Sequence, residues 1–382
     1  MIKKEIGELR RRFTTKRSNA SNIMGCYVSE KKEIISTFSL SAAMLGEEEL
    51  EKYFSLFKSS LSGTVDKNLL DISFATSQVA DSPEHKLLMT LRNSALKDEE
   101  SLKKLYSLII ESFAFDESYV ILMIADRFDV FKPSLREERK NDSEEMFSFI
   151  SCAICPVKET KSALGYESEE KTFHETDTDY ILSKPSLGFL FPAFDDRTTN
   201  IYNALYYTKS SKDNHPEVAQ AVFNVGIPMP SEEQKEVFQE VLASSLEEEC
   251  TTEVVNSIHS CLSGILEENK ENKAEESPKI SKIQLSDCLM SCGVSDEKIE
   301  HFEENYDSQF GDDAELSPHN VLSTREIVLK TENVTIKINP ERKDLFETKI
   351  IDGNPCVVIK TEGALTINGV NVKITEKEEA TV

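Results

Sequence analysis

Two cysteines of this chain have a spacing that can bind zinc or exchange disulfides. They form Cys152-Ala-Ile-Cys155-Pro156, the only C-x-x-C in the sequence. A structural zinc site needs four ligands, and a second pair is offered only by Cys288 and Cys292. A redox motif should open a helix after a strand, where the helix dipole lowers the thiol pKa. This motif instead falls within a strand pattern, which points the sulfurs in opposite directions, so we predict buried structural thiols.

Acidic residues follow two of the predicted strands. They are Asp126, Asp129, Asp195 and Asp196. If both loops met at one end of a sheet, these carboxylates could bind magnesium for phosphoryl transfer or hydrolysis. Aspartate is also common where strands end, because its side chain caps turns. We favour turns and keep a metal-dependent enzyme as the alternative.

Basic side chains are concentrated in residues 1–17, which carry a net charge of +5 and leave -30 for the rest of the chain. They are Lys3, Lys4, Arg10, Arg11, Arg12, Lys16 and Arg17. Such a segment could bind phosphate groups or dock on the protein's own acidic surface. The favoured interpretation is a solvated amphipathic helix whose Ile2, Ile6, Leu9 and Phe13 face inward.

Other catalytic signatures are missing from the sequence. No histidine stands at a spacing from serine or cysteine that predicts a nucleophile, and G-x-S-x-G is absent. The glycine-rich nucleotide motifs G-x-x-x-x-G-K-[ST] and G-x-G-x-x-G are absent too. We therefore predict no cofactor and favour a non-enzymatic protein.

Hydrophobic periodicity predicts the elements that would position these residues. The most apolar segments, 119–125 and 146–155, are predicted to be neighbouring central strands. Further strands are predicted at 25–28, 33–38, 69–74, 186–194 and 201–207. Pro192 indicates that the strand at 186–194 lies near an edge of the sheet or contains a bulge. Helices are predicted at 47–60, 84–95, 98–113, 215–224, 232–246 and 251–268. The expected fold is α+β (mixed α/β), with a central, mostly antiparallel sheet and flanking helices.

Composition predicts three regions along the chain. Residues 1–265 form the α/β body, and 266–282 form a charged linker. Residues 283–382 are predicted to hold two short helices, at 284–292 and 295–309 with Ser295 as N-cap, and a small antiparallel β module. The module spans about 326–374 and has hairpin turns at Asp352-Gly353 and Asn368-Gly369.

Overall composition indicates a soluble cytoplasmic protein. The 382 residues include 69 acidic and 44 basic residues, and the net charge of -25 repels nucleic acid and anionic membranes at long range. The longest apolar run is far shorter than a membrane helix needs, and the first residues carry no export signal. The eight scattered cysteines are predicted to be reduced. No membrane partner is expected, and the oligomeric state stays open.

Several long strings carry a resemblance to one bacterial family. They are Met1-Ile-Lys-Lys-Glu-Ile-Gly-Glu-Leu-Arg-Arg-Arg12, Gly25-Cys-Tyr-Val28, Cys152-Ala-Ile-Cys-Pro-Val157, Gly188-Phe-Leu-Phe-Pro-Ala-Phe-Asp-Asp-Arg197, Ala204-Leu-Tyr-Tyr-Thr-Lys209, Ile338-Asn-Pro-Glu-Arg342 and Ile351-Asp-Gly353. Over nearly its whole length the chain resembles the Firmicutes domain-of-unknown-function family numbered four-three-one-seven. That family has no assigned activity, so the resemblance implies a cytoplasmic bacterial protein and supplies no catalytic residues.

A fainter similarity concerns the order of elements and the tail. Leu322-Ser-Thr-Arg-Glu326, Val334-Thr-Ile-Lys-Ile-Asn339 and Ala364-Leu-Thr-Ile-Asn-Gly369 are similar to strings of the bacterial nucleoid-associated protein family. This similarity and the basic first segment together favour a non-enzymatic binding protein with nucleic acid as its partner. A protein-docking role for the β tail is a further possibility that the sequence does not rank.

Overall fold

The computed structural model describes residues 1–113, 115–130, 145–160, 162, 164–167, 169, 171–175, 179–210, 212–272, 278–312, 314–321, 327–361, 363, 365–367 and 369–373. The chain divides into two compact units. The first comprises Met1–Phe238 and Glu268–Lys279, and the second comprises Gln239–Glu267 and Ile280–Val382. The division falls within helices α7 (Ser231–Leu246) and α8 (Thr252–Glu271).

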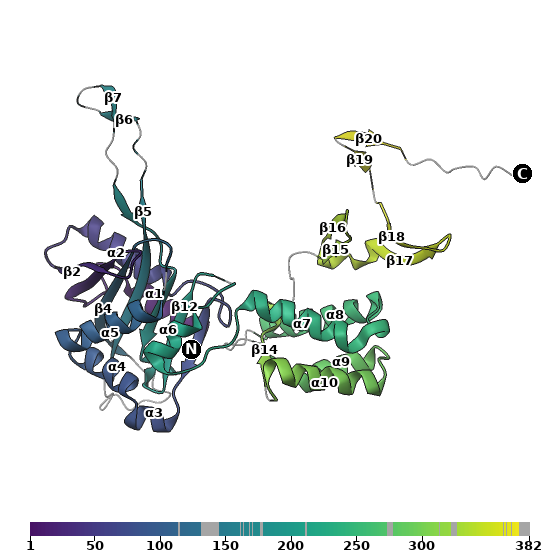
Figure 1. Cartoon of the computed structure of the whole chain (residues 1–382), viewed down its shortest axis with the longest axis horizontal. Helices are drawn as coiled ribbons and strands as arrows, with labels where there is room; N and C mark the ends of the chain where they lie inside the picture. The colour runs from purple at the N-terminus through teal and green to yellow at the C-terminus, as the bar shows by residue number, and fades with distance from the viewer. Residues whose placement is uncertain are drawn as a thin grey trace, which may run out of the picture. The chain divides into compact units, whose positions relative to one another are not determined.

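An eight-stranded antiparallel sheet forms the centre of the first unit (Figure 1). Its strand order is β2-β1-β4-β5-β9-β12-β3, and β8 pairs with β5. The strands are β1 (Asn22–Val28), β2 (Ile34–Ser41), β3 (Leu69–Ser73), β4 (Tyr119–Val130), β5 (Glu145–Glu159), β8 (Tyr180–Leu182), β9 (Leu187–Phe191) and β12 (Asn203–Thr208). The predicted α+β class, with a central antiparallel sheet, is confirmed.

Strands β4 and β5 are neighbours near the middle of the sheet, as predicted, and both extend beyond their predicted ends. The apolar pattern of β4 stops at Ala125, but pairing continues to Val130, so Asp126 and Asp129 lie in the strand rather than in a loop after it. The prediction missed this extension because alternating polar and apolar residues replace the continuous apolar run there.

Helices cover both faces of the sheet and create two cores. One core packs α4 (Pro83–Asn93), α5 (Glu99–Ser112) and α6 (Pro216–Phe223) on one face. The other core packs α1 (Lys3–Arg12) and α2 (Glu47–Ser59) on the opposite face. All five helices were predicted, whereas the short α3 (Thr76–Asp81) was not, because it buries no residue and has no apolar periodicity.

The two cysteines of the C-x-x-C motif lie on opposite faces of β5, as predicted. Cys152 belongs to the core under α4, α5 and α6, and Cys155 belongs to the core under α1 and α2. Both are buried as free thiols. Burial raises the pKa of Cys155 to about 12 and that of Cys152 further, so neither thiol ionises at neutral pH. Both therefore act as packing residues.

The segment from 186 to 208 folds into four short strands rather than two. β9 ends at Phe191 before a cis proline, Pro192, and β10 (Ala193–Asp195) then pairs with β11 (Thr198–Asn200) in a separate ribbon. β9 itself pairs with β5 and β12, so Pro192 ends an interior strand and does not mark an edge. A further ribbon, β6 (Leu164–Glu167) with β7 (Thr172–Glu175), follows β5 in the chain.

The second unit contains a group of helices. It includes parts of α7 and α8, the 3-10 helix η1 (Glu247–Glu249), α9 (Lys282–Ser291), α10 (Asp296–Phe310) and α11 (Pro318–Val321), with the strand pair β13 (Ile280–Ser281) and β14 (Glu315–Leu316). Ser295 does precede α10, but its hydroxyl donates to Glu249 (2.8 Å) and makes no capping hydrogen bond.

One cysteine prediction was wrong in this unit. Cys261 of α8 and Cys288 of α9 form a disulfide, with their Cα atoms 6.8 Å apart. A separation of 27 residues gave no sequence signal, because the helices that bring the two thiols together are set by packing. The predicted reduced state therefore holds for the other cysteines, which are free thiols.

The predicted antiparallel β module consists, in the described residues of the tail, of three two-stranded hairpins. They are β15 (Ile327–Lys330) with β16 (Thr335–Ile338), β17 (Phe346–Ile351) with β18 (Asn354–Ile359), and β19 (Leu365–Ile367) with β20 (Val370–Val372), and η2 (Pro340–Leu345) precedes β17. Asp352 and Gly353 both have positive φ, as a tight hairpin turn requires.

Several predicted features lie partly outside the described residues. Residues 273–277 of the predicted linker, 322–326 of the tail and Asn368 of the second hairpin turn belong to this group. The domain boundaries at 265 and 282 therefore stay predictions. Among the helices that the structure describes, none combines the length and apolar character needed to cross a bilayer.

Candidate nucleic-acid interface

Helix α1 carries most of the basic segment and is anchored by its apolar side. Ile6 and Leu9 are buried in the core that α1 shares with α2. Phe13, directly after the helix, stacks on Phe57 of α2 (5.8 Å between centroids) and meets Phe149 of β5 edge-on (6.1 Å). This anchoring fixes which side of the helix faces the sheet, and it leaves Arg10 and Arg11 exposed.

Four of the seven predicted basic residues line one groove with a volume of about 760 Å³. They are Arg10, Arg11, Lys16 and Arg17, and α2 contributes a fifth cation, Lys58. Gly7, Thr14, Thr15, Glu47 and Glu51 complete the lining. The groove therefore contains five cationic and two carboxylate side chains, a positive site on a strongly acidic chain.

The two carboxylates hold the wall of the groove in place. Glu51 accepts hydrogen bonds from the Thr15 amide (2.8 Å) and the Thr15 hydroxyl (3.1 Å), and Glu47 accepts a longer one from that hydroxyl (3.4 Å). These contacts join the loop after α1 to the first turns of α2. The loop carries Lys16 and Arg17, so these hydrogen bonds fix the segment that brings both cations into the groove, which Lys58 of α2 also lines.

The remaining three predicted basic residues do not line this groove. Lys3 and Lys4 are exposed at the start of α1. The guanidinium of Arg12 lies over the ring of Phe128, 4.4 Å from its centroid, and its Nε atom is buried without a hydrogen-bond partner. Arg12 thus stabilises the contact between α1 and β4 instead of facing a ligand.

Asp126 fixes Ser18 and Asn19, the residues that directly follow the basic segment. Its side chain is 4% exposed and accepts hydrogen bonds from the Ser18 hydroxyl (2.9 Å), the Asn19 amide (2.9 Å) and the Arg127 amide (2.7 Å). Burial raises the pKa of Asp126, although these donors and the nearby Arg12 oppose that shift. The carboxylate therefore ties the end of the basic segment to β4.

Asp129 and the second aspartate pair have other positions. Asp129 is exposed and, three residues along the same strand, points to the opposite face from Asp126. Asp195 accepts a hydrogen bond from Asn200 (3.0 Å), and Asp196 lies in the turn between β10 and β11 with φ of 45°. Within the described ranges, no three His, Cys, Asp or Glu side chains are grouped to hold a metal ion.

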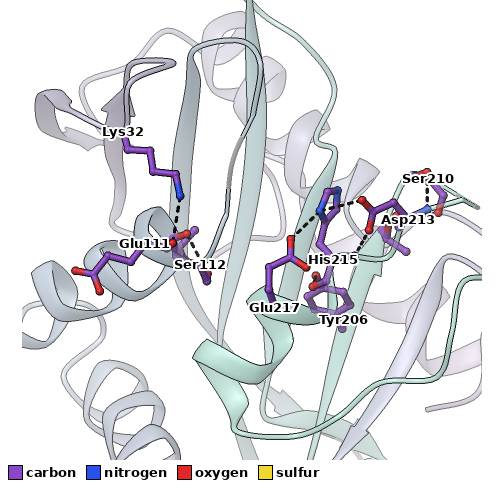
Figure 2. Close-up of polar contacts among 10 residues, drawn as sticks. Lys32, Glu111, Ser112, Tyr206, Ser210, Asp213, His215 and Glu217 are labelled. Atoms are coloured by element: carbon purple, nitrogen blue, oxygen red, sulfur yellow. Dashed lines mark hydrogen bonds and ion pairs between the residues drawn. The ribbon is translucent and has the colours of Figure 1, made fainter.

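A second polar cluster surrounds His215 at the start of α6 (Figure 2). The His215 ring nitrogen Nδ1 lies 3.1 Å from Glu217 and 3.6 Å from Asp213, while the Tyr206 hydroxyl donates to its carbonyl (3.1 Å). Its ring packs edge-on against Phe113, 4.7 Å between centroids. These contacts stabilise His215, whose backbone φ is 52°, at the start of α6. The cluster therefore has a structural role.

Glu47, Glu51 and Lys58 are the groove residues that sequence reasoning missed. All three lie on α2, at least thirty positions from the basic segment, and each is at least partly exposed in an ordinary helix pattern. The packing of Phe13 on Phe57 brings α2 against the basic segment. A search for cations one helical turn from the aromatic residues of α2 would have been the available signal.

A protein-family model matches residues 1–370, and it describes a domain of unknown function (DUF4317). No curated protein matches the chain.

Proposed function

This chain belongs to the DUF4317 family, and on that premise we propose that it is a non-enzymatic protein of the bacterial cytoplasm that binds the phosphate backbone of nucleic acid. The proposed site is the groove between α1 and α2. A nucleoid-associated role is the cellular setting that this proposal favours. The proposal rests on one observation: Arg10, Arg11, Lys16, Arg17 and Lys58 converge on one groove.

The electrostatics of the chain support a short-range phosphate site. A net charge of -25 repels a polyanion at long range, but charges beyond about 8–10 Å are largely screened at physiological salt. Guanidinium groups form paired hydrogen bonds with phosphate oxygens, so three arginines in one groove suit this ligand. The expected binding is therefore slow to form, modest in affinity and steeply dependent on salt.

The lining of the groove favours the backbone of a duplex over bases of a single strand. Proteins that bind single strands without sequence preference usually stack bases on aromatic side chains. The groove lining contains threonine, glycine and charged residues and no aromatic side chain. Contacts to phosphates position a protein on a duplex and carry no sequence information, so we expect binding without sequence preference.

The metal-dependent alternative has less support. Asp126 is committed to hydrogen bonds with backbone and hydroxyl donors, and Asp129 points away from it. Neither position favours hydrolysis or phosphoryl transfer.

Fluorescence anisotropy with a labelled duplex of about 30 base pairs tests the proposal in the full chain. If each of the five groove cations contacts one phosphate, the slope in a plot of log affinity against log salt concentration should be about -4.5, so affinity should fall about five hundredfold between 50 and 200 mM salt. Absence of binding at 50 mM salt would refute the proposed function.

A matched pair of variants identifies the groove as the site. Arg10→Ala with Arg11→Ala should lower duplex affinity at least tenfold and make the salt slope shallower by about two. Lys103→Ala with Lys104→Ala makes the same charge change on α5, which covers the opposite face of the sheet, and should leave both quantities unchanged. Equal losses in the two variants would show a general charge effect and would exclude this groove as the site.

A further inference from the structure

The hairpin of β17 and β18 has one protected edge and one open edge. In the part of the chain that the structure describes, no third strand joins this pair. The turn has two residues, so the residues that close it, Ile351 and Asn354, form a hydrogen-bonded pair. Moving away from the turn, the cross-strand pairs then alternate between non-hydrogen-bonded and hydrogen-bonded pairs. The backbone hydrogen bond from Lys360 to Leu345 (2.7 Å) fits this alternation.

The alternation fixes which backbone groups point outward. On β18 the outward positions are Pro355, Val357 and Ile359, and Pro355 has no N–H to offer, a common protection of sheet edges. On β17 the outward positions are Phe346, Thr348 and Ile350, and each points its backbone N–H and C=O away from β18 in the plane of the hairpin. The Thr348 hydroxyl lies 3.0 Å from that of Thr252, a side-chain contact that does not use these backbone groups.

The sequence of β17 is complementary to itself in antiparallel orientation. A two-fold axis at Thr348 places Phe346 opposite Ile350 of a second copy and Glu347 opposite Lys349 of a second copy. The outward residues then face one another as hydrogen-bonded pairs, which is the pattern an antiparallel ladder needs. Glu347 and Lys349, which form an ion pair within the strand (2.9 Å), then each face the opposite charge of the second copy as well, and opposite charges directly across two strands are favourable. Ile350, 79% exposed in the single chain, is covered by the second copy at its position opposite the buried Phe346.

Charge also favours a second copy at this place. Residues 327–373 contain seven basic and six acidic side chains, a net charge of +1 on a chain of -25. Two copies therefore repel each other through most of their surface and meet without repulsion at the hairpins. A hairpin of two strands is also marginally stable alone, and an added pair of strands would stabilise it.

We propose that two copies of this chain associate through β17, whose open edge pairs antiparallel with the same strand of the other copy about Thr348. The interface is isologous, since each copy contributes the same residues. It is a case of strand addition in which main-chain hydrogen bonds supply affinity and the Glu347 and Lys349 pattern sets the register.

Sedimentation velocity and light scattering on the full chain test the proposal through its mass. The chain of 43.1 kDa should sediment as a dimer at micromolar concentration. Thr348→Pro removes an outward N–H and should weaken dimerisation at least a hundredfold. Val357→Pro makes the same change at the outer edge of β18 and should leave the dimer intact. A monomeric chain, a dimer that survives Thr348→Pro, or equal loss in both variants would overturn the proposal.

The register is tested by charge exchange. Lys349→Glu places like charges across the two-fold axis at two symmetric positions, and it should raise the dissociation constant about tenfold. Glu347→Lys combined with Lys349→Glu restores opposite charges and should return the constant to within about threefold of the unmodified protein. If the double variant is as weak as the single one, another strand or protein covers this edge.

Discussion

Removal of the Asp126 carboxylate should release the end of the basic segment from the sheet. Asp126 accepts hydrogen bonds from the Ser18 hydroxyl and the Asn19 amide, across more than one hundred residues of sequence. A hydrogen bond to a charged group contributes about 1.5–3 kcal/mol, and two such bonds hold this segment. Desolvation of the carboxylate offsets part of that stabilisation. Asp126→Ala should therefore lower the free energy that holds Ser18 and Asn19 against β4 by about 2 kcal/mol.

Hydrogen exchange measures that release directly. A loss of about 2 kcal/mol predicts that the Asn19 amide exchanges about thirtyfold faster in Asp126→Ala. Mass spectrometry of a peptide covering residues 14–20 would report it. Asp129→Ala is the matched control, because it removes an exposed carboxylate from the other face of the same strand and should leave this peptide unchanged. Unchanged exchange at Asn19 in Asp126→Ala would refute the supporting role that we assign to the carboxylate.

Three further results are expected. Gly25→Ala should destabilise the protein by about 1–3 kcal/mol in urea unfolding, because an added Cβ would lie 2.0 Å from the Phe38 ring. Gly264→Ala is the control, because a Cβ added there meets no atom within 4 Å. Burial raises the pKa of Asp126, so the folded protein favours the protonated carboxyl. The contribution of this carboxyl to stability is greatest below the ordinary aspartate pKa of about 4 and is lost as pH rises through its raised pKa, so the stability advantage of the unmodified protein over Asp126→Asn should shrink as pH rises above about 4. Non-reducing peptide mapping should recover a Cys261–Cys288 cross-link, and recovery of both as free thiols would contradict the pairing.

Local patterns were sufficient to predict most of the elements but few of the contacts at the groove. The apolar run of β4, the helical spacing of Ile6, Leu9 and Phe13, and the alternation around Cys152 and Cys155 each follow from a period of one element. For this reason the sheet, α1 and the burial of the cysteines were predicted correctly.

Contacts between distant segments could not be predicted in this way. Nothing local in the sequence places Arg12 over Phe128, brings Lys58 into the groove that Arg17 lines, or lets Asp126 accept a hydrogen bond from the Asn19 amide. Each depends on how two elements pack after they form, and single-sequence patterns carry no information on that step. Counting basic residues therefore overestimated the site, because seven cations were predicted where the groove contains four of them and one from α2.

Because Cys152 and Cys155 lie on opposite faces of β5, the reactivity of their thiols can show which face of the sheet is exposed first when the first unit unfolds. The two thiols are neighbours in sequence but are covered by different helices, so a pulse of alkylating reagent would mark each side of the sheet independently. If α1 and α2 detach first, Cys155 would be modified before Cys152. Such an order would mean that the side of the sheet covered by α1 and α2 can loosen while the other side stays folded. A ligand bound in the groove between α1 and α2 would then slow labelling of Cys155 alone.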